Sequence, residues 1–426
     1  MQKLKILVFP CGSEIGLEIH RSLRFSTHIE LFGASSVNDH GKFIYKNYFG
    51  NLPYIDDENF IPLLVKLVKA NNIDAIYPAM DKVIWKLKLH ENDLGCKIIA
   101  SPIETTEICL SKKLTYQKLT GVVNLPKTYN NINTINSFPI FIKPNIGYGS
   151  RGVFKANSFD DIDYFFKNKN IKDYIISEFL TGQEYTIDCF TDRHNKLRFC
   201  GPRLRQRISN GISVNTTLVT NNSEEFFNIA EKINNSINLQ GAWFFQLKRA
   251  NDGLLTLMEI ADRLGGSSSL YRCKGINFAL LSIFDAFNIN VEIIENDYQI
   301  ELDRALDNRY KTDFIFSTVY VDLDDCLIVD NKVNTQMLGF LYNCINKNKQ
   351  IILITKHIGN VAEYLEQYKI GNIFNEVIHL GITDKKINYI KNLDSVFIDD
   401  SFSERKEVFT RFKIPVFSPD MIEAVL

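Results

Sequence analysis

The sequence has no long apolar run, no paired-cysteine pattern and no excess of charge of either sign. No stretch reaches the roughly 18 apolar residues of a membrane-spanning helix, and the run from Ile6 to Phe9 is far shorter than the core of a signal peptide. The apolar segment from Phe278 to Phe287 is interrupted by Ser282 and Asp285. We therefore expect no membrane partner and a cytoplasmic location.

Cysteine usage and net charge exclude further classes of protein. The eight cysteines are scattered and no two are spaced C-x-x-C, which argues against zinc and indicates reduced core residues. A formal charge of −1 gives no net attraction to nucleic acid. The turn from Gly12 to Gly16 lacks the complete G-x-G-x-x-G pattern, so we do not expect a dinucleotide site.

The chain of 426 residues is long enough for two or three domains, and its pattern changes along its length. Residues 1–110 alternate strands and helices, which predicts a parallel α/β sheet with helices on both faces. Residues 111–300 contain strands that follow one another in antiparallel fashion. Residues 301–316 carry mixed charge and are expected to include a linker, and residues 317–426 return to alternating strands and helices.

The expected elements can be placed on the sequence. The first segment has strands at 5–9, 28–34 and 75–77 and helices at 14–23 and 59–71. The middle segment has strands at 138–143, 174–179, 184–191, 197–202, 242–249 and 254–260. We expect the segment 205–217 to be a loop near the substrate. Asp81 follows a predicted strand, and either faces a ligand crevice or caps the next helix.

A phosphate-binding pattern lies in the middle segment. The strand Phe141–Lys143 ends in a lysine, and the loop after it contains Gly147, Gly149 and Gly152. Glycines let backbone N–H groups approach a phosphate closely, and an ammonium group neutralises its charge. The pattern alone is weak, because glycine-rich hairpins are common.

Oxygen-bearing side chains strengthen this interpretation. Glu178 lies at the end of one predicted strand, and Glu184 follows six residues later. Gln246 and Glu259 occupy neighbouring predicted strands and supply the oxygen ligands that Mg²⁺ prefers. Arg263, just beyond them, is placed to clamp a phosphoryl group during transfer.

With these motifs in this order, residues 1–300 resemble the ATP-grasp superfamily, in particular the branch that contains carbamoyl phosphate synthase and the amino-acid ligases. The resemblance implies a pre-ATP-grasp α/β domain over 1–110 and an ATP-grasp domain over 111–300, with ATP and Mg²⁺ as cofactors. Members activate a carboxylate as an acyl phosphate, an amine attacks it, and ADP and phosphate are released. Small-molecule carboxylates and amines are therefore the implied partners.

The resemblance also assigns roles to individual residues. Gln246 and Glu259 would be the Mg²⁺ ligands. Arg205 or Arg207 would steady the acyl phosphate. The residues that would bind the nucleotide are Lys112, Lys143, Gly147, Gly149, Ser150, Glu178, Phe179, Leu180 and Glu184.

One position departs from the family pattern. The family commonly has Glu-x-Asn at the second metal-binding strand, whereas this chain has Glu259-Ile260-Ala261. Either Asp262 substitutes for the missing asparagine, or one of two magnesium ions is held less fully.

Clustered acids mark the last third of the chain. The apolar run Val319–Val321 leads directly into Asp322, Asp324 and Asp325. Such a cluster is costly unless a cation or phosphate chemistry occupies it. Further along, Thr355 ends a predicted strand, as does the pair Asp399-Asp400. Parallel strands that end together in polar residues form a crevice at the carboxyl edge of a sheet.

These residues resemble the motifs of the haloacid dehalogenase-like phosphohydrolases. The resemblance implies that Asp322 is the nucleophile that forms an aspartyl phosphate and that Asp324 is the general acid and base. Thr355 would hydrogen-bond the phosphoryl oxygens, and Lys385 or Lys386 would neutralise charge. The implied Mg²⁺ ligands are Asp322, Asp324 through its carbonyl group and Asp399, with Asp400 in support. Cys326 stands where the family usually has threonine, and no catalytic group is lost.

The spacing of the motifs predicts a capless domain. About 30 residues between motifs leave room for one strand–helix–strand unit and no inserted cap. Capless members of this family accept bulky substrates. His357, two residues after Thr355, either contacts the substrate or is structural.

Three functions remain open. A bifunctional enzyme would join a carboxylate, such as a nucleotide-linked sugar acid, to an amino-alcohol phosphate and then remove the phosphate. Alternatively, the last domain is a non-catalytic docking module beside a ligase, or the first module is a kinase that the phosphatase opposes. A homodimer is one option for assembly, and the sequence does not decide it.

Overall fold

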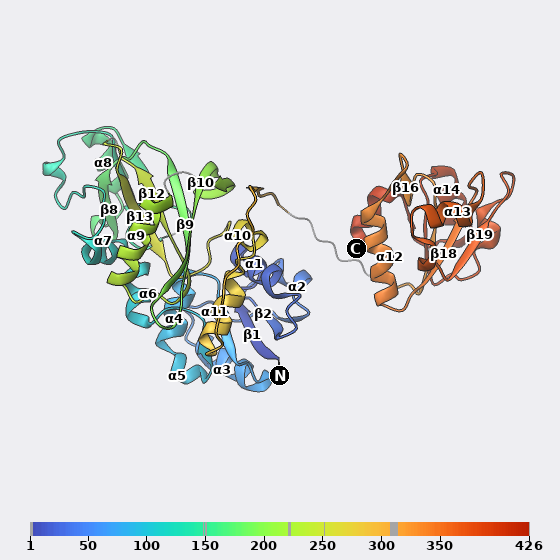
Figure 1. Cartoon of the computed structure of the whole chain (residues 1–426), viewed down its shortest axis with the longest axis horizontal. Coiled ribbons are helices and arrows are strands. Elements are labelled where there is room, and N and C mark those ends of the chain that lie inside the picture. Colours follow the sequence, from blue (N-terminus) through green and yellow to red (C-terminus); the bar gives the residue numbers. More distant parts are fainter. Residues whose placement is uncertain are drawn as a thin grey trace. The chain divides into compact units, whose positions relative to one another are not determined.

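The computed structural model describes residues 3–147, 149, 151–219, 223–250, 252–306 and 314–425, and the chain forms two compact units (Figure 1). Unit 1 is Met1–Leu306 and unit 2 is Asp307–Leu426. None of the described helices has both the length and the apolar character needed to cross a membrane.

Unit 1 begins with a parallel sheet of order β3-β2-β1-β4-β5. Its strands are β1 (Leu4–Phe9), β2 (Ile29–Ala34), β3 (Asn47–Phe49), β4 (Ala75–Pro78) and β5 (Lys97–Ile98). The helices of this region are α1 (Glu14–Leu23), α2 (Gly41–Ile44), α3 (Phe60–Asn71), α4 (Asp81–Leu89), α5 (Glu91–Leu94) and α6 (Ile103–Leu110). The strands and helices predicted here are confirmed.

The alternation of side chains along β1 explains why helices cover both faces of this sheet. Ile6 and Val8 pack in one core cluster with residues of α1, whereas Leu7 and Phe9 pack in another with residues of α3. All four side chains are buried. A run of consecutive buried apolar residues, such as Ile6 to Phe9, is typical of a parallel sheet covered on both sides.

Two antiparallel sheets follow. The smaller has the order β7-β6-β8 and the larger β13-β12-β9-β10-β11-β14. The strands of the smaller sheet are β6 (Ile140–Pro144), β7 (Phe154–Ala156) and β8 (Tyr174–Glu178). Those of the larger, central sheet are β9 (Glu184–Thr191), β10 (Leu197–Ser209), β11 (Ile212–Leu218), β12 (Gly241–Arg249), β13 (Leu255–Ala261) and β14 (Glu301–Asp303).

The helices of this part of unit 1 pack around the sheets and join them to the N-terminal region. They are α7 (Lys112–Leu119), α8 (Phe159–Phe166), α9 (Ser223–Ser236), α10 (Ser269–Cys273) and α11 (Phe278–Ala286), with short 3-10 turns η1 (Ile132–Thr134) and η2 (Ile171–Asp173). One core cluster contains Ile6 of β1, Phe190 of β9, Ala242 of β12 and Ile283 of α11. The segments 1–110 and 111–300 therefore share a core.

The segment 205–217 is not the loop that the sequence analysis expects. Strand β10 continues to Ser209, and β11 begins at Ile212. Asn210 and Gly211 form the turn between them with left-handed φ values of 49° and 77°. Asn-Gly is a strong signal for a tight hairpin, because both residues tolerate positive φ. Residues 301–303, which the sequence analysis placed in the linker, form β14 and pair with β11.

Unit 2 contains a parallel sheet of order β19-β18-β15-β20-β21 and a small hairpin, β16-β17. The strands are β15 (Thr318–Val321), β16 (Ile328–Val329), β17 (Lys332–Val333), β18 (Gln350–Thr355), β19 (Glu376–His379), β20 (Ser395–Ile398) and β21 (Val416–Phe417). Its helices are α12 (Thr335–Asn346), α13 (Val361–Gln367) and α14 (Phe402–Phe412), with 3-10 turns η3 (Gly371–Ile373), η4 (Lys386–Tyr389) and η5 (Pro419–Val425). Strand β15 is central, so the acids after it lie at the middle of the sheet edge.

Gly201 of β10 provides a test of the packing in unit 1. An added Cβ would lie 2.3 Å from Tyr271 Cζ and 2.6 Å from Phe199 Cε1. Because overpacking typically costs about 1–3 kcal/mol, we expect Gly201→Ala to lower the midpoint of urea unfolding followed by tryptophan fluorescence. Gly339→Ala in unit 2, followed by circular dichroism because both tryptophans lie in unit 1, is the control, since no atom lies within 4 Å of its added Cβ. An unchanged midpoint for Gly201→Ala would contradict the packing described.

Candidate active sites

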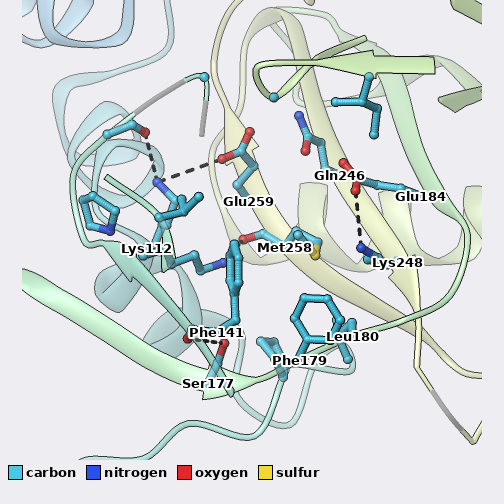
Figure 2. Close-up of a pocket in the computed structure, with 18 of the residues that line it drawn as sticks. Lys112, Phe141, Ser177, Phe179, Leu180, Glu184, Gln246, Lys248, Met258 and Glu259 are labelled. Atoms are coloured by element: carbon cyan, nitrogen blue, oxygen red, sulfur yellow. Dashed lines mark hydrogen bonds and ion pairs between the residues drawn. The ribbon is translucent and has the colours of Figure 1, made fainter. Parts of the chain in front are cut away.

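The first candidate site lies on one face of the central sheet of unit 1, where neighbouring strands bring polar side chains together (Figure 2). Glu184 of β9 pairs with Lys248 of β12, and Gln246 of β12 pairs with Glu259 of β13. Residues that pair across antiparallel strands point to the same face. These four side chains therefore line one pocket.

Arg205 joins several elements at the floor of this pocket. Its Nη1 donates to Gln246 Oε1 at 2.7 Å and to the Glu184 carboxylate, and its Nη2 donates to the Gly211 carbonyl at 2.6 Å. The Arg205 side chain is only 4% exposed. Burial lowers its pKa, and the charge of Glu184 opposes this effect. The guanidinium thus ties β9 and β12 to the β10–β11 turn.

Lys143, at the end of β6, is one of two lysines that line the pocket. Its Nζ donates to the Tyr116 hydroxyl at 2.8 Å and to the Met258 carbonyl at 3.1 Å. Both partners are uncharged, and burial lowers the Lys143 pKa to about 8. Tyr116, on α7, carried no sequence signal that linked it to the site.

Lys112 is the second lysine, and it contacts both Gly147, in the loop after β6, and Glu259 on β13. It begins α7, whose N-cap Ser111 accepts a hydrogen bond from the Leu114 N–H. The Lys112 Nζ donates to the Gly147 carbonyl at 3.0 Å and lies 3.9 Å from Glu259 Oε2 (Figure 2). Burial lowers the Lys112 pKa, and Glu259 opposes the shift.

The other end of the pocket is apolar. Phe141 and Phe179 lie with ring centroids 6.2 Å apart, and Leu180 and Met258 complete the wall (Figure 2). Planar aromatic groups bind well against such apolar side chains. Glu178 also lines this end, although its carboxylate accepts a hydrogen bond from the Lys127 N–H at 2.8 Å. Gly147 and Gly149 line the pocket, and Ser150 lies outside the described residues.

Three residues considered for the site make other contacts. Arg263 forms a two-pronged ion pair with Asp81, with N–O distances of 2.8 and 2.9 Å, and its guanidinium stacks 5.2 Å from the Phe244 ring. The Asp81 carboxylate thus neither caps helix α4 nor faces a ligand crevice, because Arg263 occupies both of its oxygens. Arg207 is exposed and pairs with Asp303.

Asp262 does not substitute for the missing asparagine. Its carboxylate is buried and accepts a hydrogen bond from the Thr106 hydroxyl at 2.7 Å. Burial raises the Asp262 pKa to about 6, against the lowering effect of that hydrogen bond. For a divalent cation, the pocket therefore offers the Glu259 carboxylate and the second lone pair of the Gln246 carbonyl oxygen. This donor set fits one Mg²⁺ held jointly with phosphate oxygens.

The second candidate site lies at the carboxyl edge of the sheet in unit 2. The Nζ of Lys386 lies 2.8 Å from Asp322 Oδ2 and 2.7 Å from Asp399 Oδ2. All three side chains are buried. Burial raises the Asp322 pKa to about 6 although Lys386 acts in the opposite direction. Burial also disfavours the charged Lys386, but the two carboxylates outweigh it and raise its pKa.

The carboxylates of this site retain capacity for a cation. Carboxylate oxygens of Asp322, Asp399 and Asp400 lie within 4.8 Å of one another. Asp322 Oδ1 is buried and has no hydrogen-bond partner among the described residues. An oxygen left unsatisfied in this way is costly unless a ligand occupies the site. The donor set of three carboxylates fits Mg²⁺.

Two further predicted residues lie beside this cluster. Thr355 is fully buried at the end of β18, and its hydroxyl accepts a hydrogen bond from the His357 N–H. Asp324 turns its carboxylate to the His357 ring, whose Nδ1 is 3.0 Å from each carboxylate oxygen. The Asp324 carboxylate is thus apart from the three that cluster for a cation.

The assignment of Lys385 to this site is wrong, and Lys386 takes its place. Lys385 is exposed and its Nζ donates to Glu407 Oε1 at 2.7 Å. Lys385 precedes the 3-10 turn η4, and Lys386 is its first residue. Successive residues at the start of such a turn point in different directions, so one lysine reaches solvent and the next reaches Asp322.

Comparisons with known proteins agree with the fold of unit 1. A family model described as "ATP-grasp in the biosynthetic pathway with Ter operon" matches residues 170–309. The biotin carboxylase domain of a Hydrogenobacter thermophilus 2-oxoglutarate carboxylase, solved with MgADP, ADP and bicarbonate, is 14% identical with a TM-score of 0.59. The match covers 69% of this chain and 72% of that one. A comparison with curated proteins gave no match.

Two other solved structures give the same result. N5-carboxyaminoimidazole synthetase from Staphylococcus aureus, complexed with ADP, is 16% identical with a TM-score of 0.60, covering 72% of this chain and 83% of that one. Biotin carboxylase from Campylobacter jejuni is 13% identical with a TM-score of 0.57, covering 68% and 72%. At these identities the likeness is one of fold, and it supports the ATP-grasp resemblance. The matched family model ends at residue 309, so the interpretation of unit 2 depends on its own geometry.

The pKa of Lys143 leads to a pH-dependent prediction. An ammonium group attracts phosphate, and the pKa of about 8 means that Lys143 loses its charge as the pH rises above that value. We expect the affinity for ADP to fall on the order of tenfold between about pH 7.5 and about pH 9. Isothermal titration calorimetry measures it. Lys143→Arg, which stays charged, should flatten the profile, and an equally steep profile in that variant would contradict the assignment.

The two adjacent lysines of unit 2 provide a matched pair of variants. If Lys386 neutralises charge at the phosphate site, Lys386→Met should lower hydrolysis of p-nitrophenyl phosphate by about 10²-fold or more. Lys385→Met should leave it unchanged, because Lys385 contacts Glu407 at the surface. Steady-state kinetics of p-nitrophenyl phosphate hydrolysis by both variants show which lysine the reaction needs. Loss of activity on changing Lys385 alone would reverse our assignment.

Proposed function

We propose that unit 1 is an ATP-dependent ligase that joins a carboxylate to an amine through an acyl phosphate. The observation that carries this proposal is the convergence of Lys112, Lys143 and Glu259 on one pocket beside an apolar slot. Ammonium groups suit the phosphates of a nucleotide, and the apolar wall to which Phe141 and Phe179 contribute suits its base. The family model over residues 170–309 and the fold of the solved relatives support the same function.

The charges of the pocket favour a polyanion. Five cationic side chains line it and three carboxylates oppose them: Lys112, Lys143, Arg151, Arg205 and Lys248 against Glu178, Glu184 and Glu259. Burial lowers the pKa of Lys112 and Lys143, so the site without ligand holds poorly compensated positive charge. A triphosphate supplies the missing negative charge. Glu259, with Gln246, would hold Mg²⁺, which contributes charge neutralisation at the phosphates.

The proposed ligation has two steps. An oxygen of the substrate carboxylate attacks the γ-phosphorus of ATP, the bond to the bridging oxygen breaks, and ADP leaves. The amine then attacks the carbonyl carbon of the acyl phosphate, and inorganic phosphate leaves while the amine loses a proton. Preorganised cations such as Arg205 favour the first step because they stabilise charge on the transferring phosphoryl group. Arg263 forms an ion pair with Asp81 and does not line this pocket.

We infer that unit 2 is a phosphomonoesterase of the haloacid dehalogenase-like type. The Oδ1 of Asp322, which has no hydrogen-bond partner among the described residues, is the nucleophile that attacks phosphorus. The bond to the leaving oxygen breaks, and that oxygen takes a proton from Asp324. Water then attacks the aspartyl phosphate, Asp324 accepts a proton, and phosphate is released. Lys386 holds Asp322 and Asp399 in place, and the three clustered carboxylates would hold Mg²⁺.

The presence of both activities in one chain suggests a common substrate. We propose that unit 1 joins a carboxylate to an amine that carries a phosphate, such as an amino-alcohol phosphate, and that unit 2 removes this phosphate. A sugar acid, nucleotide-linked or not, is the proposed carboxylate, because an uncapped phosphatase site accepts a large product. The chain would then be a bifunctional enzyme with ATP and Mg²⁺ as its cofactors.

The ligase proposal predicts that ADP release requires two substrates. Carboxylates crossed with amines and amino-alcohol phosphates should give ADP only in pairs, which a coupled assay of ADP detects. Lys143→Met should abolish the signal, because it removes a buried ammonium from the phosphate site. Asp322→Asn should leave ADP release intact as the matched control from unit 2. ADP release with a hydroxyl compound alone would indicate a kinase and contradict the proposal.

A further inference from the structure

His357 lies in the phosphatase site of unit 2 and is held from several directions. Its ring stacks on Tyr364 of α13, with centroids 4.2 Å apart and planes at 28°. Its backbone N–H donates to the Thr355 hydroxyl at 3.1 Å, and its carbonyl group lies 2.8 Å from His379 Nε2. The side chain is 14% exposed. These contacts fix the ring relative to the end of β18.

The ring in turn contacts Asp324. The His357 Nδ1 lies 3.0 Å from both carboxylate oxygens, whereas the Asp324 side chain is 46% exposed. Among the described residues, no other side chain is hydrogen-bonded to this carboxylate. A half-exposed carboxylate would otherwise sample several rotamers in water. The contact with His357 is therefore what selects one of them.

Tyr364 is itself supported, which makes the arrangement rigid. Its ring meets the edge of Tyr368 at 5.1 Å and 73°. The Tyr368 hydroxyl donates to the Asn331 carbonyl at 3.2 Å. The chain of contacts from Asn331 through Tyr368 and Tyr364 to His357 thus ends at the carboxylate of Asp324.

We propose that His357 is a positioning residue that orients Asp324 to protonate a strongly basic leaving group, so that unit 2 hydrolyses phosphate esters of aliphatic alcohols. This inference rests on the proposed phosphatase function. When Asp322 attacks phosphorus, the electron pair of the breaking P–O bond goes to the leaving oxygen. An alkoxide needs a proton at that moment, whereas a nitrophenolate is stable without one. Correct placement of Asp324 therefore matters for alkyl esters and little for activated aryl esters.

The test compares two substrates in the full-length protein. For His357→Ala, we expect kcat/KM to fall by about 10- to 10²-fold with 2-aminoethyl phosphate and by less than about threefold with p-nitrophenyl phosphate. His357→Asn keeps an N–H donor near the position of Nδ1 and should restore most of the activity toward the alkyl ester. Tyr364→Ala should show the same selectivity as His357→Ala, to a smaller degree. Hydrolysis of p-nitrophenyl phosphate serves as the control for folding.

Other outcomes would overturn the inference in distinguishable ways. Equal losses with both substrates would mean that His357 only maintains the fold, and no loss with either would mean that Asp324 is oriented without it. Failure of the wild-type chain to hydrolyse either ester, with Asp322→Asn indistinguishable from it, would overturn the phosphatase function itself.

Discussion

The buried guanidinium of Arg205 is the interaction on which the pocket of unit 1 depends. It holds Glu184, Gln246 and the Gly211 carbonyl at once, and so fixes the relative positions of three strands and one turn. A buried charge that loses its partners destabilises a protein by several kcal/mol, on the order of 3–5. The pocket floor is therefore rigid before any ligand arrives, while Lys143 and Lys112 remain poorly compensated above it.

Unit 2 uses the same physical device, a buried cation shared between acceptors. One ammonium, that of Lys386, is shared between the buried carboxylates of Asp322 and Asp399. The shared cation fixes the geometry but leaves Asp322 Oδ1 without a hydrogen-bond partner in the part of the chain that the structure describes. In both units the strand ends carry more charge of one sign than the protein neutralises. In unit 1 the excess charge is positive, which suits the phosphates of the proposed nucleotide. In unit 2 the excess charge is negative, which suits the proposed Mg²⁺.

Most of the strands that carry the sites could be predicted from the sequence, because each contains a short apolar run. The part of β10 that carries Arg205 was instead expected to be a loop. The hairpin at Asn210-Gly211 was missed although its two-residue signal was present. The choice between Lys385 and Lys386 depends on the direction of a single turn, which composition does not encode.

The contacts that join distant segments were beyond prediction. Asp81 and Arg263 are 182 residues apart, and Asp324 and His357 are 33 apart. No local pattern relates the members of either pair, since tertiary packing alone brings them together. Tyr116 illustrates the same point, because its position on α7 gives no indication that its hydroxyl meets Lys143.

We propose that the two units act in succession on one molecule. The decisive experiment is mass spectrometry of the products that Asp322→Asn and the wild-type chain make from a carboxylate and an amino-alcohol phosphate that together release ADP. We expect Asp322→Asn to accumulate an amide that still carries the phosphate of the amine, and the wild-type chain to yield the same amide without it. An identical product from both proteins would show that the two units do not act in succession.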